Sequence, residues 1–179
     1  MEQVEFLIDK ISYGWFDVSF KGSDWKVAIS ASDAWGTDTP ALLLQEIVKQ
    51  KNENLPASLY VVFDEEPGTY LLTLERKAEQ SAILTVCYSE YDDDEWPEIE
   101  RAGRKTLVEL SNLLPINETV LRAEIDYHFF LHSVYKAFLP YENTLTKIQY
   151  EKNWMLFPIK QWTEFKDFLD NFSVNKQGG

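Results

Sequence analysis

LYVVFDEEPGTYLLTLERKAEQSAILTVCY, residues 59–88, is the stretch that decides the fold. Side chains alternate between two faces over residues 59–63 and again over residues 70–74, which is typical of β-strands that bury one face. Residues 83–88 are apolar on both faces except for Thr85, as expected of a strand in the middle of a sheet. Short polar segments separate the three strands, so the stretch predicts an antiparallel meander.

The two turns of this meander can also be read from the sequence. Glu66-Pro67-Gly68-Thr69 has proline and glycine at the positions that a type II turn favours. Such a turn requires a positive φ at Gly68, so we expect Gly68→Val to destabilise the fold by about 1 kcal/mol or more through backbone strain. Residues 76–80 are polar and predict the second turn.

Further strands are predicted outside the meander. Alternation over residues 16–20 and 25–29 predicts a hairpin whose loop is Lys21-Gly22-Ser23-Asp24. The run from Val4 to Ile11 fits either another strand or a short helix. Alternation also predicts a strand at Thr106–Ser111, where a helix is the alternative.

Helices are predicted in three places. Thr39 can cap the first helix, with Pro40 in its first turn, and this helix should end near Lys51-Asn52. Apolar residues recur at steps of three and four from Asn117 to just before Pro140, which predicts one long helix. The apolar faces of the first and last helices comprise Leu43, Leu44, Ile47 and Val48, and Trp162, Phe165, Leu169 and Phe172.

These elements predict the α+β class. We expect an antiparallel sheet of meanders and hairpins, with one short helix and two C-terminal helices packed on one face. A length of 179 residues fits a single domain, 1–179, in which residues 175–179 are expected to form a flexible tail.

The chain is strongly acidic. It has 17 Lys and Arg against 30 Asp and Glu, which gives a net charge of −13. Nucleic-acid phosphates and anionic lipids repel such a chain, so we expect neither as a partner, whereas a basic protein surface attracts it. The alternative is that the charge only keeps an aromatic-rich protein soluble.

One cysteine, Cys87, excludes an internal disulfide and fits a reducing compartment. The first residues are acidic where a signal peptide is basic, and no apolar stretch is long enough to cross a bilayer, so we expect a cytoplasmic protein. No base beside Cys87 lowers its pKa, and we expect a buried structural thiol.

Two histidines, His128 and His132, stand four residues apart in the predicted long helix. This spacing suits two imidazoles on one zinc ion. However, Phe129 stands where a metalloprotease has glutamate, and Glu124 would lie about 12 Å from His132 along a helix axis. We therefore expect no metal, no cofactor and no catalytic residues here, only polar side chains at the margin of a packed helix.

An acidic loop between residues 90 and 100 is the strongest candidate for a binding surface. Its acids lack the glycine turn of a calcium loop, whereas aromatic side chains beside carboxylates are typical of protein-binding hot spots. The predicted partner-binding residues are Tyr91, Asp92, Asp93, Asp94, Glu95 and Trp96, with Trp35 from a second loop. The alternatives are a solvated loop and tryptophans that cover a sheet edge.

Three short motifs resemble those of an uncharacterised family of acidic bacterial α+β proteins. They are Ile29-Ser30-Ala31-Ser32-Asp33 before a leucine-rich helix, Phe63-Asp64-Glu65-Glu66-Pro67-Gly68-Thr69-Tyr70, and Tyr150, Trp154 and Phe157-Pro158 before the last helix. The resemblance implies no catalytic residues. In size and acidity the chain is also similar to the immunity proteins that neutralise bacterial toxins.

Three functions are compatible with these features. The first is a protein-binding module of inhibitor or immunity type that engages a basic partner, for example a nuclease toxin. The second is a small-ligand-binding protein or an enzyme with a pocket between sheet and helices, and the third is an oligomeric structural or regulatory subunit. The acidic charge and the aromatic residues among the acids favour the first function.

Overall fold

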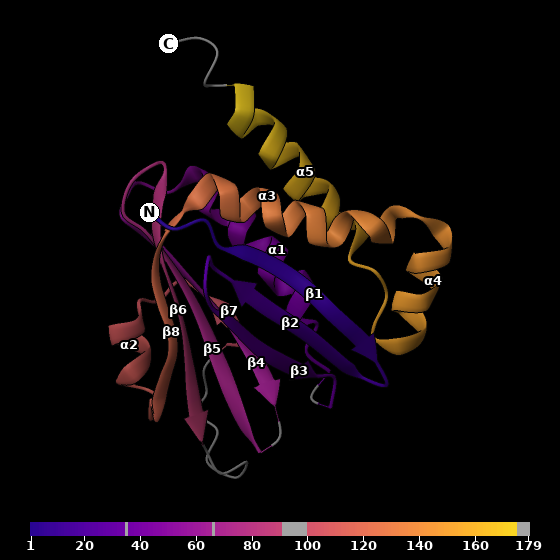
Figure 1. The fold of residues 1–179 in the computed structure, drawn as a ribbon, viewed down its shortest axis with the longest axis horizontal. Coiled ribbons are helices and arrows are strands. Elements are labelled where there is room, and N and C mark those ends of the chain that lie inside the picture. Colours follow the sequence, from indigo (N-terminus) through magenta and orange to yellow (C-terminus); the bar gives the residue numbers. More distant parts are fainter. Residues whose placement is uncertain (35, 66, 91–99, 175–179) are drawn as a thin grey trace.

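The computed structural model describes residues 1–34, 36–65, 67–90 and 100–174 (Figure 1). Its strands form two antiparallel sheets, of three and five strands, with helices packed against them. This arrangement confirms the α+β class with antiparallel sheets. No helix in the described ranges is both long and apolar enough to cross a membrane.

The first sheet is a meander in the order β1-β2-β3. Its strands are β1 (Glu5–Ser12), β2 (Trp15–Lys21) and β3 (Lys26–Ser32). The run from Val4 to Ile11 thus contributes a strand, and the predicted hairpin of β2 and β3 is confirmed, with its loop at residues 22–25, one residue later than expected. Because side chains alternate across a strand, one face of this sheet enters the main core and the other carries mostly polar and charged residues.

The second sheet has the order β7-β4-β5-β6-β8. Its strands are β4 (Ala57–Glu65), β5 (Gly68–Arg76), β6 (Ser81–Glu90), β7 (Ala102–Gly103) and β8 (Glu118–Asp126). Strands β4, β5 and β6 are the predicted meander. Strand β6 is buried on both faces at its centre, and Cys87 there is fully buried, as expected.

Helices cover both faces of the five-stranded sheet. α1 (Thr39–Lys49), followed by the 3₁₀ turn η1 (Gln50–Asn52), lies with α3 (Tyr127–Phe138) and α5 (Ile159–Val174) on the side of the main core (Figure 1). The turn η3 (Leu139–Glu142) and α4 (Thr144–Asn153) connect α3 to α5. α2 (Leu107–Ser111) packs on the opposite face against Tyr60, Val62, Leu71 and Cys87, because that face is apolar as well. The three predicted helices thus pack on one face, as expected, whereas α2 lies on the opposite face where a strand was predicted, and α4 was not predicted.

The chain start joins the two sheets. Glu2 forms a parallel bridge to β8, in which its N–H donates to the carbonyl of Glu124 and its carbonyl accepts from the N–H of Asp126, both at 2.8 Å. α3 runs beside the free edge of β1, where the Phe6 N–H donates to Ser133 Oγ at 2.8 Å. Both contacts cover backbone groups that would otherwise leave an open sheet edge.

The predicted long helix from Asn117 is wrong in its first half. Residues 118–126 form β8, in which Leu121 and Ile125 face the core beside Val86 and Ala82 of β6. The Asp126 carboxylate then accepts the N–H of Phe129 at 3.0 Å and caps α3. Apolar residues recur at steps of three and four on both sides of this junction between strand and helix. The spacing therefore imitated one continuous helix.

Two helix starts also differ from the prediction. Asp38 caps α1, since its carboxylate accepts the N–H of Ala41 at 3.3 Å, while Thr39 is already the first residue of that helix. Thr106–Ser111 contains helix α2 and not the predicted strand. The Thr106 side chain and the Glu109 side chain each accept the other residue's backbone N–H, which is a capping box.

Gly68 does not have the predicted positive φ. It begins β5 and pairs directly with Glu65 of β4. The position is restricted for another reason, because a Cβ at Gly68 would lie 2.6 Å from two carbons of the Tyr88 ring. Glycine is therefore required by close packing and not by a left-handed turn.

Candidate functional site

All of the predicted partner-binding residues lie outside the described residues. Trp35 is one of them, and residues 91–99 contain the remaining six. The structure describes Glu90 and Glu100, which border that loop and are both exposed. Glu100 is held in place because its carbonyl accepts the Tyr60 hydroxyl at 3.0 Å.

A patch of acidic and aromatic side chains lies beside this loop. Strand pairing places Tyr70, Tyr88 and Glu118 in one row across β5, β6 and β8, and Glu65 and Glu90 in the next row. Residues two apart in a strand share a face, so both rows continue the face that carries the main core. We call Glu65, Tyr70, Tyr88, Glu90 and Glu118 the acidic–aromatic patch. All five are half-buried or exposed, at the end of the sheet away from α3 and α5 (Figure 1).

The two tyrosines of the patch form a fixed pair. Their ring centroids are 5.3 Å apart at an angle of 55°. The Tyr70 hydroxyl donates a hydrogen bond to the Glu65 carboxylate. The Tyr88 ring lies directly over Gly68, and a Cβ at that position would collide with the ring. Both rings are therefore positioned before any partner arrives.

Electrostatic repulsion acts on the patch. Burial raises the pKa of Glu65, and the nearby Asp17 of β2 raises it further, whereas the hydrogen bond from Tyr70 lowers it. Burial also raises the pKa of Tyr70, and the carboxylates of Glu65 and Glu118 add to this rise. Glu65 thus lies within interaction range of the Asp17 charge, Glu65 and Glu118 both lie within range of Tyr70, and none of the five patch residues is basic. A cationic group placed here would relieve the repulsion.

The two histidines do not form a metal site with Glu124. Glu124 belongs to β8, whereas His128 and His132 belong to α3. The His128 ring packs against the Phe172 ring of α5 with centroids 4.5 Å apart, and His132 is exposed. Among the described residues there is no group of three or more His, Cys, Asp or Glu side chains that could hold a metal ion.

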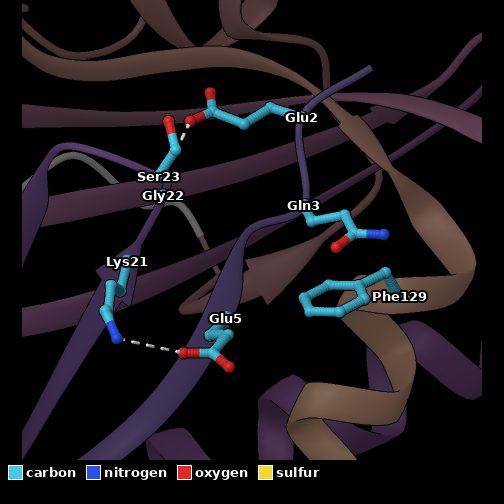
Figure 2. Close-up of a pocket in the computed structure, with 7 residues that line it drawn as sticks. All are labelled: Glu2, Gln3, Glu5, Lys21, Gly22, Ser23 and Phe129. Atoms are coloured by element: carbon cyan, nitrogen blue, oxygen red, sulfur yellow. Dashed lines mark hydrogen bonds and ion pairs between the residues drawn. The ribbon is translucent and has the colours of Figure 1, made fainter.

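A pocket of about 580 Å³ (Figure 2) lies beside the chain start, the loop after β2 and the first turn of α3. We call it the N-terminal pocket; its lining residues are Glu2, Gln3, Glu5, Lys21, Gly22, Ser23 and Phe129. Lys21 Nζ lies 3.7 Å from Glu5 Oε2, so one of the two carboxylates already faces an ammonium group. No sequence motif indicated this pocket, because its three segments are far apart along the chain.

No protein-family model matches this chain, and no similar curated protein or solved structure was found. The resemblance to a bacterial family therefore stays a prediction.

Proposed function

We propose that this protein is a binding module of inhibitor or immunity type that engages a basic protein partner in the cytoplasm. The contact surface is the acidic–aromatic patch. The observation that supports this proposal most strongly is a contacting pair of tyrosines, Tyr70 and Tyr88, surrounded by three carboxylates with no base among the five residues. Aromatic anchors within a charged rim are typical of protein-binding surfaces.

The ionised form of Glu65 supports an external role for the patch. Burial and the Asp17 charge both disfavour the carboxylate form, so this charge does not stabilise the folded chain. An arginine or lysine of a partner would lower the pKa of Glu65 and strengthen binding of the ionised form. The net charge of −13 would also speed the approach of a basic protein.

The tyrosines support the same proposal through their rigidity. Tyrosine offers a large amphipathic contact area and has few rotatable bonds to immobilise. Because Tyr70 is already hydrogen-bonded to Glu65 and Tyr88 already lies over Gly68, little side-chain entropy remains to be lost on binding. A nuclease with a basic phosphate-binding surface would present the complementary charge.

A titration of the ¹⁵N-labelled protein with a hexa-lysine peptide tests the patch directly. We expect the largest shifts at Glu65, Tyr70 and Tyr88, with affinity that falls as salt rises. Glu65→Gln combined with Glu118→Gln should weaken binding about tenfold, since each exposed charge pair contributes up to about 1 kcal/mol.

The matched control is Glu79→Gln combined with Glu164→Gln. It removes the same charge from exposed positions outside the patch, in the β5–β6 turn and on α5. We expect it to weaken binding less than twofold. Equal weakening by both double variants, or shifts centred elsewhere, would mean that the peptide responds only to net charge and would contradict the proposal.

A further inference from the structure

The N-terminal pocket has one carboxylate that is held rigidly. Glu2 Oε1 accepts the Trp25 Nε1–H at 2.7 Å and the Ser23 N–H at 3.4 Å. The backbone of Glu2 is fixed by its bridge to β8. A residue so close to a chain end usually moves freely unless it is tied down. Its carboxylate is therefore oriented before a ligand binds.

Gly22 makes this arrangement possible. A Cβ at Gly22 would collide with Glu2 Oε1 and would lie 2.5 Å from Trp25 Nε1. The glycine thus leaves the space in which the carboxylate and the indole meet. The backbone bridge of Glu2 joins the first sheet to β8. That structural role involves only the backbone of Glu2 and does not require the carboxylate to lie in this position.

The second carboxylate, Glu5, already has a cation beside it. Lys21 Nζ lies 3.7 Å from Glu5 Oε2, and the two side chains are 55% and 45% exposed. Such an exposed and long ion pair contributes little to stability, so another cation can replace the lysine readily. Lys21 shows where a positive charge fits in the pocket.

Phe129 provides an aromatic wall. It lies in the first turn of α3, and its side chain is half-buried. Figure 2 shows Glu2 and Ser23 on one side of the pocket, Lys21 and Glu5 on another, and Gln3 and Phe129 on a third. A flat cation that replaces Lys21 at Glu5 could also lie against this ring.

We propose that the N-terminal pocket binds a guanidinium group, which replaces Lys21 at Glu5 and stacks on Phe129, with the fixed Glu2 carboxylate adding negative charge to the pocket. Guanidinium suits the site better than ammonium, because its planar fork can pair with the Glu5 carboxylate while its face packs on a ring. The pocket is independent of the acidic–aromatic patch. The pocket adjoins Asp126, which pairs with Ser81 at the start of β6. The patch lies at the other end of β6.

The test is an NMR titration with N-acetyl-arginine amide and with an arginine-containing tripeptide. N-acetyl-citrulline amide, which has the same shape without the charge, is the control ligand. We expect both arginine probes to shift Phe129 and Gly22 and the citrulline probe to leave them unchanged. Clearly tighter binding of the tripeptide identifies a protein arginine as the natural ligand, and equal binding identifies a small guanidinium compound.

Variants distinguish the pocket from general attraction to an acidic protein. Glu5→Gln should weaken N-acetyl-arginine amide binding about tenfold or more, and Phe129→Leu should weaken it several-fold. Lys21→Met should strengthen binding about two- to fivefold, because the competing ammonium is gone.

Lys147→Met is the matched control for Lys21→Met. Lys147 also lies 3.7 Å from a glutamate oxygen, of Glu151, but belongs to α4, so the variant changes the net charge equally and should leave affinity unchanged. Absence of binding by both arginine probes, equal binding of citrulline, or equal effects of the two lysine variants would overturn the proposal. The acidic–aromatic patch would be unaffected by that result.

Discussion

Gly68→Ala perturbs the packing that orients Tyr88 in the acidic–aromatic patch. The backbone at Gly68 is not in the left-handed region, so alanine fits its φ. The added Cβ would lie 2.6 Å from two carbons of the Tyr88 ring, which must then move away from its contact with Tyr70 at 5.3 Å. Overpacking costs about 1–3 kcal/mol and an aromatic pair contributes about 0.5–1.5 kcal/mol. Because Tyr88 is only half-buried, we expect the free energy of unfolding to fall by about 1.5 kcal/mol.

The same substitution in a Tyr88→Ala background isolates the cause. Without the ring, Gly68→Ala should be neutral or should stabilise the fold by about 0.4–1 kcal/mol, because alanine loses less chain entropy on folding. Urea unfolding followed by tryptophan fluorescence gives all four free energies, and we expect a coupling energy of about 2 kcal/mol. A cost of similar size in both backgrounds would show that the backbone, and not Tyr88, requires glycine. That result would refute the packing explanation.

Three further predictions concern single positions. Burial raises the pKa of Glu65 above its ordinary value of 4.5, so the stabilising effect of its protonated form is present below pH 4.5 and is lost as the pH rises through the folded-state pKa. Glu65→Gln should therefore increase the free energy of unfolding at pH 7 but not at pH 4, as measured by urea unfolding, and a decrease at pH 7 would contradict this. Tyr13 has a φ of 53° and is 91% exposed, so Tyr13→Asn should stabilise the fold by about 0.5–1 kcal/mol, and a lower melting temperature would argue against strain there. Purified protein should contain no stoichiometric zinc by elemental analysis, and one zinc per chain that is lost in His128→Ala would reverse this expectation.

The meander could be predicted because local alternation alone determines it. Residues 59–88 carry strand periodicity and turn residues in the same short stretch, and each strand pairs with its neighbour along the chain. The region after Asn117 was misread because a strand and a helix follow each other without a gap. Their apolar residues together imitate one helical period, although Asp126 marks the helix start. The Thr106 and Glu109 capping box was a readable signal that alternation overrode.

The binding surfaces depend on contacts that a single sequence does not reveal. Alternation places Glu65 on the same face as the core residue Phe63, but only the pairing of β6 with β8 brings Glu118 beside Tyr88. The N-terminal pocket depends on a bridge between Glu2 and β8, more than a hundred residues apart. Such registers follow from tertiary packing and not from local periodicity.

The most direct test of the acidic–aromatic patch is a quantitative comparison of proteins captured from extracts of the native cell. Three baits are needed: the unaltered protein, the Glu65→Gln and Glu118→Gln double variant, and the Glu79→Gln and Glu164→Gln control. If the patch binds a basic partner, one basic protein should be enriched on the unaltered and control baits and lost from the patch variant. Capture of the same proteins by all three baits, or of an acidic partner, would contradict the proposed function.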